Sequence, residues 1–435
     1  MELQAAILLI TVFFLLLILN VPVSYSIIAS AFVTITAFLS FNFGTFVSAQ
    51  KVIAGIDSFS LIAVPFFILA GLLMSSGGIA RRLINLAMLV LGRVPGALAL
   101  TNAAGNAMFG SISGSGIAAA TAIGGVMLPL EKEDGYDDGF AAAMNVATAP
   151  VGQLIPPTTA FIIYSTASGG TSVATLFMAG WIPGLVWTVC CMVVGYYIAK
   201  KYGYVRTVEN NITFGYALKV IWEAIPSLFL IVIIIGGILS GYFTPTEASG
   251  VAVAYAFILS VLFYRSIKLS EIPDILVNTA IMTTVVMLII GASSVLSFVL
   301  SFTGLPTVIS KMVLGITDNK YILLFIMNIF LLIVGTFMDM APALLIFTPI
   351  FLPIVKSFGM TPVQFGVMIV FNLAVGTITP PVGNVLFVGC SLAKLKLEVV
   401  LKSLMPFFIA IFVALLLTTY VPALSEWLPS ILGLM

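Results

Sequence analysis

Two stretches of this sequence interrupt apolar segments with glycine and paired prolines, and they occupy matching places in two halves of the chain. Residues 152–159 read GQLIPPTT, and residues 376–383, which begin 224 residues later, read GTITPPVG. The same offset relates GVMLP, which ends at Pro129, to PIFLP, which ends at Pro353. A constant offset without gaps indicates an internal duplication. Broken apolar segments at matching positions of two halves are typical of a transporter's binding site, because unwound backbone at membrane depth is tolerated only around a cavity.

The composition is that of a polytopic membrane protein. Of 435 residues, 61% are hydrophobic and 8% are charged, whereas soluble domains have roughly 45–50% apolar and 25% charged residues. The net charge of +1 argues against a nucleic-acid partner. The absence of histidine excludes histidine proton relays, imidazole metal sites and Ser-His catalysis. Cys190, Cys191 and Cys390 fit neither a disulfide framework nor a zinc site.

Eight segments are long and apolar enough to be predicted spans, since a bilayer core about 30 Å thick needs about 20 residues of helix. They are residues 4–20, 24–41, 58–76, 174–199, 220–241, 246–264, 275–300 and 403–421. The first segment has no basic region or cleavage site before it, so we predict a retained span and no removed signal peptide.

Four further segments are irregular. Residues 95–130 contain two short apolar arms around GSISGSG, and residues 320–355 contain two more around GTFMDMAP. Because each arm is too short to cross alone, we predict two helical hairpins that enter the membrane and return. Residues 137–168 and 363–393 are long segments broken at their Pro-Pro motifs, where proline removes a backbone donor and disfavours helix at the preceding residue.

The basic residues support this topology through the positive-inside rule. If the hairpins return and the broken helices cross the membrane, both termini are predicted to lie outside. Four of the 17 basic residues are then also outside: Lys51, Lys311, Lys320 and Lys356. The other thirteen lie inside: Arg81, Arg82, Arg93, Lys132, Lys200, Lys201, Arg206, Lys219, Arg265, Lys268, Lys394, Lys396 and Lys402. The hairpins then open to opposite sides, which makes the halves inverted repeats. We predict interfacial helices at residues 83–92 and 305–318.

The first hairpin tip offers oxygen ligands. Ser111, Ser113 and Ser115 alternate with glycines there, and helix ends leave free N–H and C=O groups that suit a carboxylate and a sodium ion respectively. Close helix packing is the alternative, since Gly and Ser also line helix interfaces in membranes. The repeated pairing of a tip with a broken helix favours a site.

Hydroxyl groups also flank both Pro-Pro motifs. Thr158 and Thr159 lie in the first broken helix, and Thr377 and Thr379 lie in the second. They are candidate ligands. Equally, they can satisfy the backbone groups that the prolines leave free.

Asp339 is the acidic residue that we single out. It falls at the second hairpin tip, where an ionised carboxylate is costly without a cation, and we predict that it binds sodium. The alternative is an N-cap for the returning arm, which begins near Ala341 and Pro342. The two roles are compatible.

Other charged residues have structural explanations. The sequence TPTE at residues 244–247 predicts a capping box in which Glu247 occupies N3, and Asp57 is predicted at the polar start of a span. All five arginines lie at predicted inner helix ends. Substrate charge must therefore be met by helix termini, hydroxyls or a co-transported cation.

A series of motifs in order along the chain carries a family resemblance. They are FGSISGSGIAAATAIGG, EKEDGYDDGFAAA, PVGQLIPPTTAFIIY, LFMAGWIPGL, FTPTEA, GTFMDMAPALLIFTPIFLPI and NLAVGTITPPVGNVLF. The chain resembles, over its whole length, the large membrane subunit of tripartite ATP-independent periplasmic (TRAP) transporters. SISGSG and KEDGY are more similar to the sialic-acid members than to the C4-dicarboxylate members.

The resemblance implies an all-α ion-transporter-type fold with inverted repeats, whose hairpins and broken helices move as an elevator against scaffold helices. It implies uptake of an organic acid coupled to Na⁺ at two or more sites. It also implies two partners in the bacterial inner membrane system, a small four-helix membrane subunit and a periplasmic substrate-binding protein.

Site residues follow from the same resemblance. The implied sodium-binding residues are Ser111, Ser113, Ser115, Gly152, Pro156, Gly335, Thr336, Asp339, Gly376 and Thr379. The implied substrate-binding residues are Ser113, Ser115, Pro157, Thr158, Thr159 and Pro381. We expect scaffold helices in residues 1–56, a cytoplasmic loop in 200–219, scaffold helices in 220–274 and a tail in 422–435. The first repeat, in 57–199, is expected to comprise a scaffold helix, a hairpin, a broken helix and a second scaffold helix. The second repeat, in 275–421, is expected to comprise a scaffold helix, a hairpin, a broken helix and a final helix.

Other functions fit less well, and no enzymatic activity is predicted. An intramembrane aspartyl protease needs two facing aspartates, but only Asp339 is predicted within the membrane and no GxGD motif is present. An ATP-driven pump needs a phosphate-binding GxxxxGK[ST] loop, which the chain lacks. A stand-alone sodium/carboxylate symporter and an ion channel remain alternatives.

Overall fold

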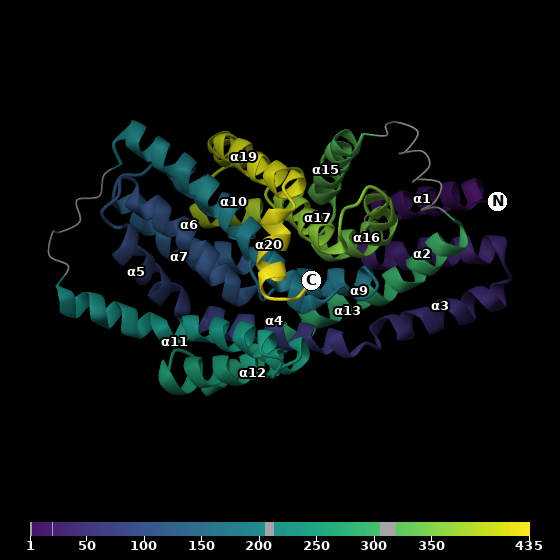
Figure 1. Ribbon diagram of the computed structural model, residues 1–435, viewed down its shortest axis with the longest axis horizontal. Coiled ribbons are helices and arrows are strands. Elements are labelled where there is room, and N and C mark those ends of the chain that lie inside the picture. The colour runs from purple at the N-terminus through teal and green to yellow at the C-terminus, as the bar shows by residue number, and fades with distance from the viewer. Residues whose placement is uncertain (1, 20, 205–212, 305–318) are drawn as a thin grey trace.

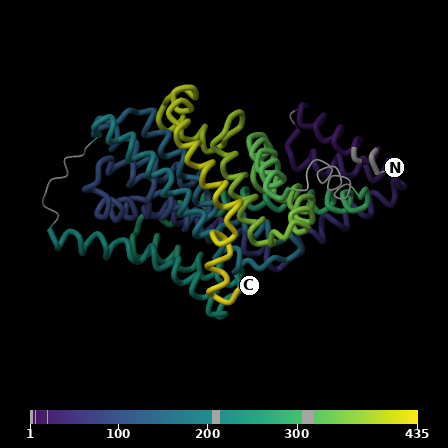
Figure 2. Tube along the Cα trace, turned by 45° about the horizontal axis from the view of Figure 1, so that its top comes forward, coloured from purple at the N-terminus to yellow at the C-terminus, as the bar shows by residue number. Residues whose placement is uncertain are grey.

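The chain is helical throughout the part that the structure describes. The computed structural model describes residues 2–19, 21–204, 213–304 and 319–435, and these ranges contain no strand (Figure 1). The molecule is elongated, with its N-terminus at one end and its C-terminus near the middle (Figures 1 and 2). The predicted all-α fold is confirmed. The predicted interfacial helix at residues 305–318 and residues 205–212 of the predicted loop at 200–219 lie outside the described residues, while residues 200–202 belong to α10 (Val173–Tyr202) and 214–219 to α11 (Phe214–Leu239).

Eight described helical segments are long and apolar enough to cross a membrane. Six of them match predicted spans, and the other two, Lys320–Phe337 and Met340–Ser357, are the arms of the second hairpin. The prediction that these arms are too short to cross is therefore wrong by length, since 18 residues of helix extend about 27 Å. The predicted spans 4–20 and 24–41 form shorter helices of 17 and 16 residues.

The helices divide into two groups by their packing. The first group, here called the frame, comprises α1 (Glu2–Ile18), α2 (Val23–Phe38), α3 (Phe41–Ile56), α4 (Ala63–Ser76), α11 (Phe214–Leu239), α12 (Pro245–Phe257) and α13 (Ile272–Phe302). The second, here called the bundle, comprises α6 (Ala97–Ser113), α7 (Gly116–Glu133), α8 (Asp138–Thr148), α9 (Thr159–Ala167), α10 (Val173–Tyr202), α15 (Lys320–Phe337), α16 (Met340–Ser357), α17 (Pro362–Gly376), α18 (Asn384–Ala393), α19 (Leu397–Tyr420) and α20 (Ala423–Ile431).

The last helix of each repeat packs against the hairpins and broken helices. α10 was expected in the scaffold, but it packs against α6, α17, α19 and α20. α19, expected as the final helix of the second repeat, packs against α8 and α17. Trp187 of α10, for example, is fully buried and donates a hydrogen bond to the carbonyl oxygen of Ala147 at the end of α8 (2.8 Å). The packing thus assigns α10 and α19 to the bundle.

Two helices were not predicted. α3 follows Ser40, whose hydroxyl caps it by accepting from Phe43 N, and it packs along α13, where Gly55 faces Ser294. Its asparagine, glutamine, lysine and glycine residues lower its hydropathy below that of a span. α20 lies in the predicted C-terminal tail and packs against α10, while the hydroxyl of Thr175 in α10 donates to the carbonyl oxygen of Leu434.

The duplication is visible in the helix boundaries. α6 and α15 end 224 residues apart, at Ser113 and Phe337. α7 and α16 start and end with the same offset, as do the starts of α8 and α17. Both predicted broken helices are confirmed, since α8 continues as a 3₁₀ turn (Ala149–Gln153) before the break and α17 ends at Gly376. The Pro156-Pro157 and Pro380-Pro381 bonds are both cis.

The hairpin of each repeat packs on the broken helix of the other repeat. The returning arm α7 packs on α18, the second half of the other repeat's broken helix, and α16 packs in the same way on α9. Between the broken helices, Val146 of α8 faces Gly389 of α18, and the hydroxyl of Tyr164 in α9 donates to the carbonyl oxygen of Pro362 (2.6 Å). These reciprocal contacts make one bundle from two inverted repeats.

Several local predictions can be compared directly with the structure. The capping box at Thr244 and Glu247 is confirmed, with both reciprocal hydrogen bonds present. Asp57 lies at the C-cap of α3, so it ends one helix and does not start a span. α5 (Ile79–Leu91) covers the predicted segment 83–92 and buries Leu83, Ile84 and Ala87 along one face. Its position at a membrane interface stays a prediction.

Candidate functional site

In the first repeat the hairpin meets the broken helix through two glycines. A Cβ placed on Gly110, near the end of α6, would lie 2.5 Å from the Cα and 2.9 Å from the N of Gly152. Real Cβ atoms do not approach other atoms this closely, so the contact requires glycine. The backbone of the hairpin therefore lies directly against the 3₁₀ turn that precedes the break, with no side chain between them.

The second repeat has the equivalent contact. A Cβ on Gly376, at the end of α17, would lie 2.3 Å from both the C and the O atoms of Gly335 in α15. The backbone N–H of Val382 in the break also donates to the carbonyl oxygen of Thr336 (3.2 Å). Sequence analysis selected Gly152, Gly335 and Gly376, but it did not single out Gly110 as a partner.

The first hairpin tip lies between three other segments. Gly114 has φ +63°, and a Cβ there would lie 2.8 Å from the carbonyl oxygen of Pro157. A Cβ on Gly116 would lie 3.2 Å from the Cα of Pro150 and 3.3 Å from Cγ2 of Val385 in α18. The tip thus adjoins the break of its own repeat and the broken helix of the other repeat. Val385 lies in the first turn of α18, which directly follows the second break.

The serines of this tip are partly engaged in local hydrogen bonds. Ser115 caps α7 by accepting from Ala118 N, and Ser111 donates to the carbonyl oxygen of Met108 (2.7 Å). The Ser113 hydroxyl accepts from the backbone N–H of Ser115 (3.4 Å). A hydroxyl has one proton and two lone pairs, so each oxygen keeps capacity to accept from a ligand or to coordinate a cation.

The threonines at the breaks fulfil the structural role that sequence analysis gave as the alternative. Thr158 caps α9 by accepting from Ala160 N. Thr377 and Thr379 donate to carbonyl oxygens one turn earlier, at distances of 2.7 and 2.8 Å. Their oxygens retain lone pairs, so the structural role leaves room for ligation. Thr159 is the first residue of α9, beside Pro157 in the break.

Asp339 occupies the N-cap position of α16 with extended backbone, but its carboxylate makes no capping hydrogen bond. The side-chain N–H of Asn384, the first residue of α18, instead donates to Oδ1 of Asp339 (3.4 Å). The carboxylate is exposed at the tip and faces the break of its own repeat. No basic residue among those described lies within 4.0 Å of it. Its geometry is compatible with a cation ligand, whereas the capping alternative is wrong for the side chain.

A buried polar network escaped the sequence analysis. Asn106 of α6 donates through its side-chain nitrogen to Asn102 Oδ1 (3.0 Å), Asn145 Oδ1 (3.0 Å) and Thr148 Oγ1 (2.9 Å). Asn102 in turn donates to the carboxylate of Glu131, which is fully buried. Unlike Asp339, whose carboxylate is exposed at its tip, Glu131 is enclosed by the protein. The four-residue spacing of Asn102 and Asn106 in apolar sequence was the available signal.

The second repeat has its own buried amide cluster. Asn372 of α17 donates to Asn328 Oδ1 (2.7 Å), and Asn328 donates to the hydroxyl of Thr419 (3.1 Å). Gln364 donates to the carbonyl oxygen of Thr419 (2.9 Å). These bonds join α15, α17 and α19. In each repeat the first arm of the hairpin, α6 or α15, thus contacts the first half of the broken helix through side-chain amides as well as through glycines.

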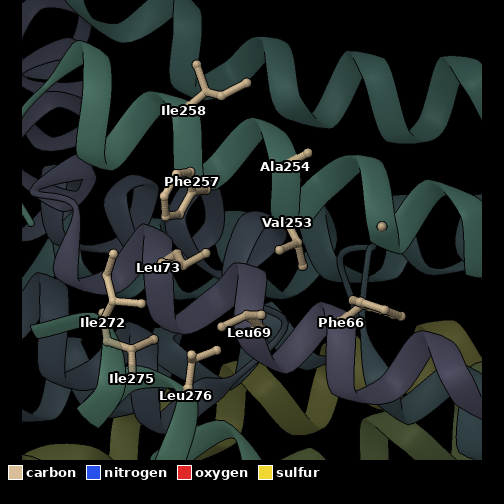
Figure 3. Close-up of a pocket in the computed structure, with 11 residues that line it drawn as sticks. Phe66, Leu69, Leu73, Val253, Ala254, Phe257, Ile258, Ile272, Ile275 and Leu276 are labelled. Carbon is tan, nitrogen blue, oxygen red and sulfur yellow. The ribbon is translucent and has the colours of Figure 1, made fainter. Parts of the chain in front are cut away.

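A metal site built from acids and cysteines is not found among the described residues, where no three such side chains cluster. An apolar pocket of about 520 Å³ lies in the frame between α4, α12 and α13, lined by side chains such as Phe66, Leu69 and Phe257 (Figure 3). It offers no polar side chain to an anion. The hairpin tips and breaks therefore remain the candidate site.

Comparison with protein families places the chain. Residues 10–424 match the family described as the tripartite ATP-independent periplasmic transporter, DctM component. The chain belongs to this family. The matched range includes the frame from the middle of α1 onward and the bundle up to the start of α20. The DctM assignment therefore covers both repeats.

Relatives of this DctM-family chain support the assignment over nearly the whole length of this chain. YgiK of Salmonella typhimurium is 46% identical, with 96% of both chains covered. The sialic acid TRAP transporter large permease protein SiaM of Vibrio cholerae is 36% identical, again with 96% of both covered. The isethionate TRAP transporter permease protein DctMQ of Oleidesulfovibrio alaskensis is 39% identical over 95% of this chain but only 64% of its own length. These relatives identify a transporter permease and no enzyme.

A solved structure shows the same fold at low sequence similarity. The MtrF protein of Neisseria gonorrhoeae superposes with a TM-score of 0.59 over 87% of this chain and 85% of its own, at 14% identity. At that identity the likeness concerns the fold alone.

Proposed function

We propose that this permease imports an organic acid together with sodium ions, and that it works with a small membrane subunit and a periplasmic substrate-binding protein. The observation that carries this proposal is the glycine contact between hairpin and broken helix in both repeats. There, helix ends with free backbone groups and several hydroxyls lie together without bulky side chains. Free C=O groups suit a sodium ion, and free N–H groups suit a carboxylate.

Two sodium sites follow from the two contacts. In the first, Ser111, Ser113 and Ser115 would act with Gly152 and Pro156. In the second, Gly335, Thr336 and Asp339 would act with Gly376 and Thr379. Asp339 supports the second site, because an ionised carboxylate at a membrane hairpin tip is costly without a cation.

The substrate would bind where the tip of the first hairpin meets both Pro-Pro regions. Ser113, Ser115, Thr158 and Thr159 supply hydroxyls there, beside Pro157 and, across the centre, Pro381. Two relatives of comparable identity are named for isethionate and for sialic acid, which share an acidic group and little else. The proposal therefore commits to a small organic acid. Within that class, the SISGSG tip favours sialic acid (N-acetylneuraminate).

The division into frame and bundle supports an elevator mechanism, in which the bundle carries the site across the membrane against the frame. Both repeats contribute interlocked helices to the bundle, so it can move as one body. In the bacterial inner membrane, the proposed topology places both termini at the periplasmic side. This orientation rests on the distribution of lysine and arginine.

Uptake by proteoliposomes tests the function. The permease, reconstituted with its small subunit and a matching binding protein, should accumulate radiolabelled substrate only when a sodium gradient is imposed. A ligand screen on the binding protein, with sialic acid, succinate and isethionate included, identifies that substrate beforehand. Uptake that proceeds at full rate without sodium would contradict sodium coupling. Uptake without the binding protein would favour a stand-alone symporter.

A further inference from the structure

A second cavity lies away from the hairpin tips, at the boundary between frame and bundle. It has a volume of about 540 Å³, within the range of small-molecule sites. On the frame side it is lined by residues of α3 and α13, including Lys51 and Ser293. On the bundle side it is lined by residues of α9 and α16, including Thr166 and Pro349. We call this cavity the serine recess.

One wall of the recess is a row of hydroxyls. Ser293, Ser297 and Ser301 recur every four residues on α13 and so lie along one stripe of that helix, with Ser294 beside them. Ser301 donates to the carbonyl oxygen of Ser297 (2.9 Å), and Ser294 donates to that of Ile290 (3.1 Å). Both hydroxyl oxygens keep lone pairs, and serines at this spacing can turn outward to a ligand.

Ser293 differs from its neighbours because its hydroxyl is unsatisfied. The residue is only 2% exposed, and its Oγ has no hydrogen-bond partner among the described residues. A buried hydroxyl without a partner costs about 1–3 kcal/mol. Native structures leave few such groups. Such a donor in the wall of a cavity of this size is compatible with an acceptor supplied by a ligand.

The recess also contains a positive charge without a counter-charge. Lys51 of α3 lies with its ammonium 5.5 Å from the ring centroid of Phe298, and both side chains line the cavity. No carboxylate among the described residues lies within 4.0 Å of that ammonium. A half-buried lysine over an aromatic face can bind the acidic group of an anion, and the neighbouring hydroxyls can donate hydrogen bonds to its other polar groups.

We propose that the serine recess is an anion-binding site for the transported organic acid, separate from the site at the hairpin tips. Lys51 binds the acidic group, and Ser293 and Ser297 donate to its oxygens. Because frame and bundle both line the recess, a bound acid lies between the moving and the fixed part. The choice of anion rests on the proposed function, whereas the presence of an anion site does not.

Cysteine protection tests the recess directly. Cys190, Cys191 and Cys390 are replaced by Ala, and Ser301→Cys, which is exposed at the rim, is labelled with a membrane-impermeant maleimide. The full chain is reconstituted with its small subunit in phosphatidylcholine vesicles, without a sodium gradient or binding protein. Sialic acid, succinate and isethionate are added in turn against chloride at equal ionic strength. At saturation, at least one acid should slow labelling about fivefold or more.

Lysine variants then assign the protection to Lys51. Lys51→Met should raise the half-protecting concentration about tenfold or more, as expected for loss of a charge-assisted hydrogen bond. Lys51→Arg should keep the protection. Lys356→Met, at another predicted outer lysine that does not line the cavity, should leave it unchanged. Ser293→Ala should weaken protection without changing the unprotected labelling rate.

Three results would overturn the proposal. The first is an equal labelling rate with every acid and with chloride, and the second is equal protection in Lys51→Met and the unchanged protein. The third is protection by added phosphatidylglycerol but by none of the soluble acids, which would identify a lipid headgroup as the occupant. Since labelling needs no sodium gradient, failure of sodium-coupled uptake leaves this outcome unaffected. Conversely, sodium-coupled uptake with an unprotected recess would retain the proposed function and reject this site.

Discussion

At the scale of single residues, the two glycine pairs explain how a hairpin can lie against a broken helix. Gly110 meets Gly152 at a distance that excludes a Cβ on either residue, and Gly376 meets Gly335 at a distance that excludes a Cβ on Gly376. Bulkier residues would separate the two backbones and move the free carbonyl and N–H groups apart. Backbone ligation of a small cation needs those groups to stay within coordination distance of one centre.

Gly376→Ala should therefore destabilise the permease and reduce sodium affinity. The new methyl group would meet the backbone of Gly335 at 2.3 Å, and overpacking of this kind costs about 1–3 kcal/mol. The measurements are the thermal midpoint in detergent and the sodium dependence of uptake. Gly236→Ala in α11, where a Cβ meets no atom within 4 Å, is the matched control. Equal behaviour of the two variants would refute the role of the close contact.

Asp339→Asn should weaken the sodium dependence of uptake while leaving membrane insertion intact. The amide keeps the shape and the bond to Asn384 can be replaced, but the charge that would neutralise a sodium ion is lost. The half-saturating sodium concentration in proteoliposomes measures the effect, which we expect to be about tenfold or more. Asp57→Asn, at the C-cap of α3, is the control. Unchanged sodium affinity in Asp339→Asn would remove this residue from the site.

Sequence reasoning found single residues where their chemistry was unusual for the segment, as with Asp339 and the tip serines. It missed Glu131 because a charged residue near a helix end is ordinarily solvated, and it missed Asn102 and Asn106 because the sequence alone does not show which residues they face. Only the fold shows that Glu131 is fully buried and that Asn102 faces it. A carboxylate without a basic partner among the described residues, held by one amide, marks the first repeat as chemically different from the second.

At the scale of elements, the broken helices depend on caps that restart the chain after each break. Thr158 caps α9, and Ser115 caps α7 on the adjoining tip. In the second repeat, α18 starts at Gly383 and Asn384 without a side-chain cap. The repeats therefore share geometry but differ in how firmly the second half of the broken helix is anchored.

Thr158→Ala should lower the free energy of unfolding by about 1 kcal/mol, the usual contribution of an N-cap hydroxyl. Thr158→Ser should restore it. Ser172→Ala removes the equivalent cap of α10 and should destabilise equally, but only the change at Thr158 should also slow uptake. Thermal unfolding in detergent and initial uptake rates separate the two effects. Identical uptake in Thr158→Ala and wild type would restrict Thr158 to a structural role.

At the scale of the whole molecule, the packing of each repeat's returning arm on the other repeat's broken helix creates the bundle. Its contacts with the frame are made mainly by α4 and α13, while α5 packs against both α6 of the bundle and α11 of the frame. At one of them, a Cβ on Gly71 of α4 would lie 3.0 Å from the carbonyl oxygen of Ser113 at the first hairpin tip. In the proposed elevator mechanism, movement of the bundle would therefore break contacts at the tips while preserving those between repeats.

A disulfide between the two repeats should leave transport intact. In Val146→Cys/Gly389→Cys, with the native cysteines replaced, the two Cβ atoms lie about 3.7 Å apart, which suits a disulfide. Because α8 and α18 move together in the proposed mechanism, oxidation should preserve at least half of the uptake rate. Oxidised and reduced proteoliposomes are compared. Loss of uptake on oxidation that returns on reduction would show that the repeats move relative to each other.

The sequence by itself determined the membrane class, the duplication with its 224-residue offset, the two hairpins and the two broken helices. These features are encoded locally, because apolar length, glycine tips and paired prolines act on the chain where they occur. It also predicted the capping box at Thr244 correctly. It missed α3, whose polar residues hide a helix that is stabilised by packing against α13.

Only the tertiary structure decided which segments meet. α10 and α19 have ordinary apolar sequences, and nothing in them distinguishes a scaffold helix from a bundle helix until their neighbours are known. The same holds for the glycine pairs, whose members lie about 40 residues apart in each repeat, and for the serine recess, which four separate helices line. The GQLIPPTT and GTITPPVG motifs thus identify where the chain breaks, whereas long-range packing determines what each break faces.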